Sequence, residues 1–303
     1  MIELKSISKV YNPGLFKAKI RAVSDLSLTI RQGEVFGLIG PNGAGKSSTI
    51  RMLLKLIKPD SGSITFQGKP IWDLSLQKDI GYLPENPYLY DHLTLLELLT
   101  FCGKSSGLEK KQIAASAMTL MEKLNLLDAR KRPLRTFSKG MLQRAGICFA
   151  LLHNPSIVIL DEPMSGLDPV GRKMVFDLIM ELKNNGKTVF LCSHILNDVE
   201  RLCDRIGIMN KGHLVRAFER RELMQVGESS IFLQTQKLLQ TQILKLESMG
   251  CSCREHGNEM LIALTRDGFY EVTEHLQSVG VRVLGCRSEW VSLEDLFMQT
   301  IKG

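Results

Sequence analysis

The 303-residue chain has no long apolar run, no dense block of like charge and no regular cysteine pattern. A helix needs roughly 20 consecutive apolar residues to cross a bilayer. The apolar stretches of this chain, such as SIVIL and ICFALL, are far shorter, and its first residues, MIELKSISKV, lack the apolar segment of a signal peptide. We therefore expect a cytosolic protein without a membrane span of its own.

The cysteines argue against a disulfide-bonded protein and against a structural zinc site, and the net charge gives little support for a strongly acidic partner. Seven scattered cysteines do not resemble a disulfide framework, which fits a reducing compartment. Cys251 and Cys253 precede His256, but a structural zinc site usually has four ligands and no second pair lies nearby in the sequence. The net charge of +7 is spread along the chain, so it supports acidic partners only weakly. Charge alone does not exclude nucleic acid, but we expect no nucleic-acid partner.

Length and composition indicate two globular domains. The chain is about twice the ~150 residues of a typical domain, and its 44% hydrophobic and 23% charged residues are ordinary for a globular protein. The character of the sequence changes near Arg221. We expect a larger domain over 1–221 and a small accessory domain over 222–303.

A phosphate-binding loop is the strongest motif that is present. The segment EVFGLIGPNGAGKSSTIRMLLKLI begins with an apolar strand, 35–39, and ends with a helix whose apolar residues run from Ile50 to Ile57. The turn between them fits GxxxxGK[ST] at every fixed position. Its backbone N–H groups and the helix N-terminus favour phosphate, Lys46 neutralises the β- and γ-phosphates of ATP, and Ser47 holds Mg²⁺. The expected nucleotide-binding residues of this phosphate loop are Gly40, Pro41, Asn42, Gly43, Ala44, Gly45, Lys46, Ser47 and Ser48.

A second buried strand ends on two carboxylates, in the segment SIVILDEP. Its four apolar residues are typical of a strand inside a parallel sheet, and such sheets bind ligands at the carboxyl ends of their strands. We expect Asp161 to reach Mg²⁺, through water, and Glu162 to polarise a water for attack on the γ-phosphate. Together with the phosphate loop, these residues predict a site that hydrolyses ATP with Mg²⁺.

The order of further motifs points to one family. After the phosphate loop come GYLPE at 81–85, SKGM at 138–141, LDEP at 160–163, SGLDP at 165–169 and Ser193-His194. In this order and at these intervals, residues 1–221 resemble the ATP-binding subunit of an ABC transporter. The resemblance implies an α/β P-loop NTPase fold with a mixed sheet and a helical subdomain at about 86–150.

The resemblance also implies roles for residues that the motifs alone leave unassigned. Tyr11 corresponds to the aromatic residue that stacks on adenine, and His194 to the histidine that contacts the γ-phosphate. Ser138, Gly140 and Asp168 correspond to residues that meet the ATP held by a second subunit. The resemblance thus implies a homodimer, or a heterodimer with a similar ATPase, in the ATP-bound state.

Two departures from the family pattern indicate which branch of the family the chain resembles. Glu85 stands where the broader family mostly has glutamine, at a position linked to Mg²⁺ and the attacking water. The signature segment, 137–141, reads FSKGM instead of the commoner LSGGQ. Both resemble subunits that drive export through separately encoded integral membrane permeases, with the ATPase peripheral at the cytoplasmic face of the membrane. The alternative, a soluble ABC ATPase that remodels ribosomes or DNA, predicts tandem cassettes or a long inserted coiled coil, and the sequence has neither.

Two helical regions between the loop and the acidic strand complete the larger domain. Residues 91–133 read as helices broken at Gly103 and at 105–107. An apolar patch is expected there to contact a membrane subunit, although each leucine is equally compatible with helical core; its members are Leu95, Leu98, Leu99 and Phe101. Ser138 is expected to cap a second helix. The residues expected to face inward on that helix are Met141, Leu142, Ala145, Cys148 and Phe149.

The last residues alternate short strand and helix patterns. Segments such as SIFLQT, EMLIALT and VRVLGC predict a ferredoxin-like βαββαβ unit, and SLEDLFMQTIKG predicts an amphipathic helix after it. No catalytic constellation is apparent in this region. We expect a small regulatory, dimer-stabilising or partner-binding module.

Overall fold

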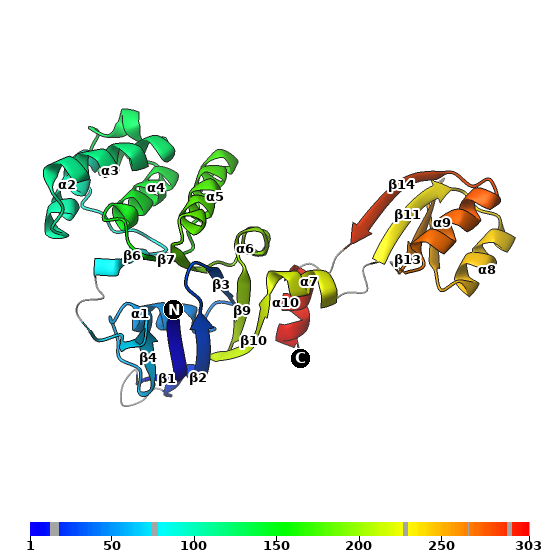
Figure 1. The fold of residues 1–303 in the computed structure, drawn as a ribbon, viewed down its shortest axis with the longest axis horizontal. Helices are drawn as coiled ribbons and strands as arrows, with labels where there is room; N and C mark the ends of the chain where they lie inside the picture. The colour runs from blue at the N-terminus through cyan, green and yellow to red at the C-terminus, as the bar shows by residue number, and fades with distance from the viewer. Residues whose placement is uncertain are drawn as a thin grey trace. The chain divides into compact units, whose positions relative to one another are not determined.

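The computed structural model describes residues 1–12, 18–73, 78–226, 230–257, 259–265, 267–289 and 293–302. It divides into two compact units, Met1–Phe218 and Glu219–Gly303 (Figure 1). Within the described ranges, no helix is both long and apolar enough to cross a membrane.

A six-stranded sheet forms the centre of the first unit. Its order is β10 (His213–Glu219), β9 (Arg205–Asn210), β3 (Val35–Ile39), β8 (Thr188–Cys192), β7 (Ile157–Asp161) and β6 (Ile80–Leu83). The strands β9, β3, β8, β7 and β6 pair in parallel. Every residue of β3, β7 and β8 is buried, as expected for apolar runs covered on both faces. The carboxyl ends of these parallel strands therefore meet at one edge.

A second, antiparallel sheet packs beside the first. Its order is β2 (Ile20–Ile30), β1 (Ile2–Tyr11), β4 (Ser61–Phe66) and β5 (Lys69–Pro70). One hydrophobic core joins residues of both sheets to the helix α1 (Lys46–Leu53) and includes Leu4, Ile50, Ile64, Phe36 and Phe190. The expected mixed α/β architecture is confirmed, because parallel and antiparallel strands both contribute to this unit.

Helices form a subdomain between β6 and β7. They are α2 (Leu95–Ser105), α3 (Lys110–Lys123), α4 (Lys139–Leu151) and two short 3₁₀ turns, Leu127–Ala129 and Leu134–Thr136. Two more helices, α5 (Pro169–Asn184) and α6 (Leu196–Leu202), follow β7 and β8. Figure 1 shows α2, α3 and α4 grouped together, away from the antiparallel sheet.

The expected break at Gly103 is wrong, because α2 runs through it to Ser105. A Cβ atom at Gly103 would lie 2.5 Å from Cγ1 of Ile113 on α3. The glycine therefore allows two helices to approach closely and does not end one. The expected break at 105–107 agrees with the structure, since Gly107 takes a left-handed φ of 78° after the helix.

The apolar patch expected on α2 is also largely wrong. Leu95, Leu98 and Leu99 are at most 1% exposed and belong to the core of the helical subdomain. Phe101 is 54% exposed, and its ring meets that of Tyr90 edge to face at 6.3 Å. The three leucines stabilise the subdomain, and Phe101 alone of the four predicted residues lies on its surface.

The second unit is the expected ferredoxin-like fold. Its elements are β11 (Ser230–Gln236), α8 (Gln240–Ser248), β12 (Ser252–His256), β13 (Glu259–Leu264), α9 (Phe269–Ser278) and β14 (Val283–Glu289). The antiparallel sheet has the order β12-β13-β11-β14. Leu246 of α8 and Leu276 of α9 join its core. Two further helices of this unit, α7 (Arg220–Val226) and α10 (Leu293–Lys302), precede and follow these elements in sequence.

Candidate functional site

The candidate site lies where four neighbouring parallel strands end. The phosphate loop follows β3, His194 follows β8, Glu162 follows β7 and Glu85 follows β6. These strands are consecutive in the sheet, in the order β3-β8-β7-β6. Residues more than 140 positions apart in sequence are therefore brought to one edge of the sheet, as the motifs predicted.

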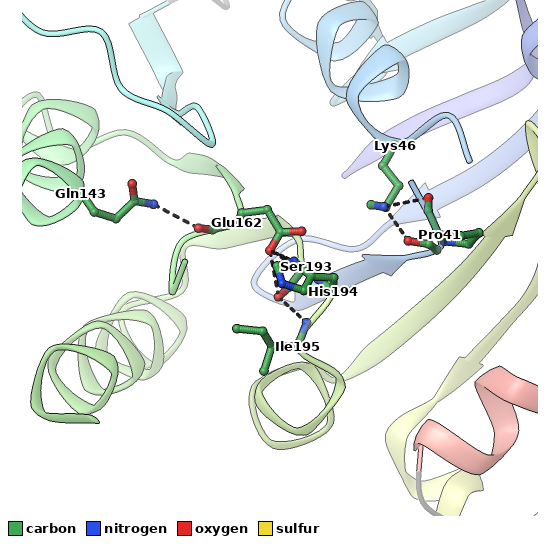
Figure 2. A network of polar contacts seen from close by, with 8 residues as sticks. Pro41, Lys46, Gln143, Glu162, Ser193, His194 and Ile195 are labelled. Carbon is green, nitrogen blue, oxygen red and sulfur yellow. Dashed lines mark hydrogen bonds and ion pairs between the residues drawn. The ribbon is translucent and has the colours of Figure 1, made fainter. Parts of the chain in front are cut away.

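The phosphate loop, residues 40–48, needs glycine at two of its positions. A Cβ atom at Gly40 would lie 2.4 Å from the carbonyl oxygen of Met209, and Gly45 has a φ of 109°. Only glycine adopts such backbone and approaches so closely without strain. Lys46 lies over the loop, and its Nζ donates to the carbonyl oxygens of Gly40 at 2.6 Å and Pro41 at 3.2 Å (Figure 2).

Tyr11 lies beside the start of α1. Its Oη is 3.4 Å from Oγ of Ser48, a hydrogen bond in which either hydroxyl can donate. Ser47 is exposed, next to Lys46 at the first turn of the same helix. The structure thus brings the predicted aromatic residue to the same helix terminus as the predicted phosphate and metal residues.

Asp161 carries the most perturbed carboxyl group of the site. Burial, together with the negative charges of Glu162 and Glu85, raises its pKa to about 6, against the lowering effect of Lys46 and Arg51. Asp161 is only 8% exposed to solvent. Burial and the charge of Asp161 likewise raise the pKa of Tyr82, on β6, to about 12. The edge therefore concentrates negative charge in a poorly solvated place.

Glu162 contacts the residues that follow the neighbouring strand. Asp161 pairs with Cys192 across β7 and β8, so Glu162 lies next to Ser193 and His194. Its Oε2 lies 2.8 Å from Nδ1 of His194 and 3.4 Å from Oγ of Ser193, and it accepts the His194 backbone N–H at 3.3 Å (Figure 2). Glu162 is buried, whereas the His194 side chain is 64% exposed. The Glu162 carboxylate is thus buried and held by contacts with Ser193 and His194, while the imidazole of His194 remains accessible to solvent.

The signature segment and Asp168 lie at the beginnings of two other helices. Ser138 caps α4, and its Oγ accepts the backbone N–H of Met141 at 3.2 Å. Asp168 caps α5, and its Oδ1 accepts the N–H of Gly171 at 2.8 Å. For both side chains, the hydrogen bonds seen in the described ranges stay within their own helix and do not reach the phosphate loop. Ser138 and Asp168 are exposed, so both helix beginnings face outward.

The interior face expected for α4 is partly wrong. Ala145 and Cys148 are buried as expected, but Phe149 is 39% exposed and Met141 is only half-buried. Gln143 is instead fully buried, at 2% exposure, and its Nε2 donates to the backbone oxygen of Glu162 at 3.0 Å. The sequence analysis missed this residue. The available signal was a polar side chain two positions before Ala145, on the apolar face of the helix.

Comparison with known proteins identifies similar chains. The sequence matches the ABC transporter family over residues 23–165, a segment that contains the phosphate loop and Asp161-Glu162. It is 46% identical to an uncharacterised ABC transporter ATP-binding protein of Synechocystis over 71% of this chain, which spans 62% of that relative. It is 34% identical to the bacitracin transport ATP-binding protein BcrA of Bacillus licheniformis, over 93% of each chain.

A similar solved structure is a dimer. The post-hydrolysis state of the ATP-binding cassette MJ0796, bound to ADP and phosphate, aligns with a TM-score of 0.68 and 26% identity. The alignment covers 73% of this chain and 99% of that one.

Proposed function

Because the chain belongs to the ABC transporter family, as one of its ATP-binding subunits that hydrolyse ATP, we propose that two such subunits enclose two ATP molecules. Each ATP contacts the phosphate loop of one subunit and the signature segment of the other. The outward beginning of α4 supports this, because its amides and the Ser138 hydroxyl favour an anion that its own phosphate loop does not supply. Asp168 belongs to the same contact.

The contact between Glu162 and His194 is the observation that carries the proposal. In our assignment, Glu162 is the general base that polarises the attacking water, and His194 binds the γ-phosphate and holds that water in line. The 2.8 Å contact between Oε2 of Glu162 and Nδ1 of His194 holds the two side chains next to each other at the same edge of the sheet. Lys46 stabilises the charge that develops on the phosphates.

The residues at this edge fit a magnesium ion. Among the residues described here, no group of three or more His, Cys, Asp or Glu side chains forms a closed metal cluster. Mg²⁺ needs no such cluster, because it is held by one or two carboxylates together with water and substrate phosphates. Burial and the charges of two neighbouring carboxylates raise the pKa of Asp161, and a divalent cation bound there would relieve the repulsion between the carboxylates. We assign Ser47 and Asp161 to the metal, with Glu85 as a further contact, and when bound the ion neutralises the β- and γ-phosphate oxygens.

We further propose that the subunit drives export by separately encoded permeases, at the cytoplasmic face of a membrane. The relative BcrA, a bacitracin transport protein, supports this because it matches 93% of this chain and therefore extends beyond the first unit. The relatives named above are transport or transporter proteins, and neither points to ribosome or DNA remodelling. Tyr11 takes the adenine-stacking role, and the ferredoxin-like unit is assigned an accessory role.

Glu162→Gln tests the assignment of the base. The amide keeps the size of the side chain but does not accept a proton, so we expect kcat to fall by about 10³-fold. Affinity for ATP, measured by fluorescence of a labelled analogue, is expected to stay near that of the wild type. Glu181→Gln, which changes an exposed carboxylate on α5, is the control. Normal turnover in the Glu162 variant would remove this residue as the base.

A further inference from the structure

Gln143 is a buried polar residue that links the helix of the signature segment to Glu162. It lies on α4, near Ser138, and is 2% exposed. A buried amide is costly unless its groups are hydrogen-bonded. Its Nε2 donates to the backbone oxygen of Glu162 at 3.0 Å, as Figure 2 shows.

The bond matters because the backbone of Glu162 is strained. Its φ is 51°, a left-handed conformation that residues with a side chain rarely adopt. The Glu162 N–H donates to the carbonyl oxygen of Cys192 at 2.9 Å, and its own carbonyl oxygen accepts the N–H of Ser165 at 3.1 Å. Gln143 supplies the third hydrogen bond. This sharp turn after β7 directs the carboxylate toward Ser193 and His194.

We propose that Gln143 is a positioning residue, which holds the Glu162 backbone in the left-handed conformation that aims its carboxylate at the attacking water. The proposal rests on the role of Glu162 as the base. It is distinct from that role, because Gln143 donates to the backbone and touches no reacting atom.

The placement of Gln143 also joins the two halves of the dimeric site. The helix that carries it begins at Ser138, which we assign to the ATP of the partner subunit. A Cβ atom at Gly140 would lie 3.3 Å from the carbonyl oxygen of Gly166, so the start of α4 also packs against the loop after Glu162. Closure of α4 on the partner's ATP therefore acts on a helix already bonded to the subunit's own base.

Two variants remove the hydrogen bond in different ways. Gln143→Met keeps the length and suits an apolar surrounding, whereas Gln143→Asn keeps the amide but is too short to reach the Glu162 oxygen. For both we expect kcat to fall by about tenfold to a hundredfold, with the KM for ATP within about twofold of the wild type. Cys148→Ala is the control, since Cys148 is fully buried on the same helix and, among the described residues, forms no hydrogen bond to Glu162.

Combining the variants separates positioning from general stability. In a Glu162→Gln background, adding Gln143→Met is expected to change the residual rate by less than about twofold, because the residue that it positions no longer acts as a base. ATP-dependent dimerisation in that background is expected to persist. A kcat loss equal to that of Cys148→Ala, or a full further loss in the Glu162→Gln background, would overturn the proposal. Normal hydrolysis by Glu162→Gln alone would instead overturn the proposed function.

Discussion

At the scale of single residues, the site is an edge where negative charge is concentrated and poorly solvated. Asp161 and Glu162 lie at the end of β7, and Glu85 follows the adjacent strand β6. Lys46 and Arg51 are the cations that lower the pKa of the Asp161 carboxyl. Such an arrangement is unfavourable for the protein alone and favourable once a metal–nucleotide complex is bound. Function and stability therefore oppose each other at this edge.

The pH dependence of the stability of Asp161→Asn tests whether the ionised carboxyl of Asp161 destabilises the folded protein. The Asp161 pKa rises from 3.8 to about 6 on folding, so the stabilising contribution of the protonated carboxyl is present below pH 3.8 and is lost as pH rises through about 6. The rise corresponds to at most about 3 kcal/mol. Thermal unfolding of the nucleotide-free protein should show the variant gaining stability over the wild type between pH 5 and pH 8.

Asp177→Asn is the matched control, because this exposed carboxylate pairs with Lys173 on the surface of α5. Its difference from the wild type should change little over the same range. If Asp161→Asn showed the same difference at both pH values, the assigned cause of the raised pKa would be wrong.

At the scale of elements, glycine sets the distance between α2 and α3. Gly103→Val places a side chain against Ile113, so we expect the free energy of unfolding to fall by about 2 kcal/mol. Denaturant unfolding measures the loss, and combining it with Ile113→Ala should recover part of it. Ala115→Val, on the exposed face of α3, is the control. Equal losses in both valine variants would contradict a tight contact at Gly103.

The elements that position the site could be predicted from local pattern. Strands β3 and β7 read as short apolar runs, because a strand buried on both faces needs apolar residues throughout. The sequence did not show where helix α1 ends, since Ile57 continues the apolar spacing although the helix stops at Leu53. Lys55, with a φ of 61°, turns the chain out of the helix. Because this position is a lysine and not the glycine or asparagine that usually ends a helix in this way, the sequence does not predict the turn.

The errors concern what covers a surface, which local pattern does not report. Leu98 and its neighbours on α2 read as an apolar face, but periodicity is the same whether a partner protein or another helix of the chain covers that face. Gln143 was missed for a related reason, because its partner is the backbone oxygen of Glu162, in the turn after β7, which lies beside it only after folding. Glu162 could be predicted as the carboxylate at the strand end, but its left-handed backbone could not.

At the scale of the whole molecule, the chain joins an ATP-hydrolysing unit to a ferredoxin-like one. The family resemblance implied the fold of the first, the alternating strand and helix patterns predicted that of the second, and the structure confirms both. The accessory role of the second unit, and the contact with permeases, remain proposals. The exposed helix beginnings at Ser138 and Asp168 are the features of the first unit that support the proposal of a second subunit.

Lys139→Glu separates the effect of a charge on helix α4 itself from its effect on the ATP of the partner subunit. A carboxylate in the first turn of α4 is favourable to the helix of its own chain, yet it would face the phosphates of the ATP bound by the partner. We expect normal folding and ATP binding but loss of ATP-dependent dimerisation. Lys110→Glu, at the first turn of α3, makes the same change of charge at another helix N-terminus and serves as the control.

The most direct test of the dimeric site is the mass of Glu162→Gln measured by light scattering during size-exclusion chromatography. With Mg²⁺ and ATP the variant should double its mass from the 34.0 kDa of one chain, and it should return to that mass when ATP is removed. Adding Lys139→Glu should abolish the change, whereas adding Lys110→Glu should not. A variant that binds ATP but keeps the mass of one chain, or whose dimer is indifferent to Lys139→Glu, would contradict the account.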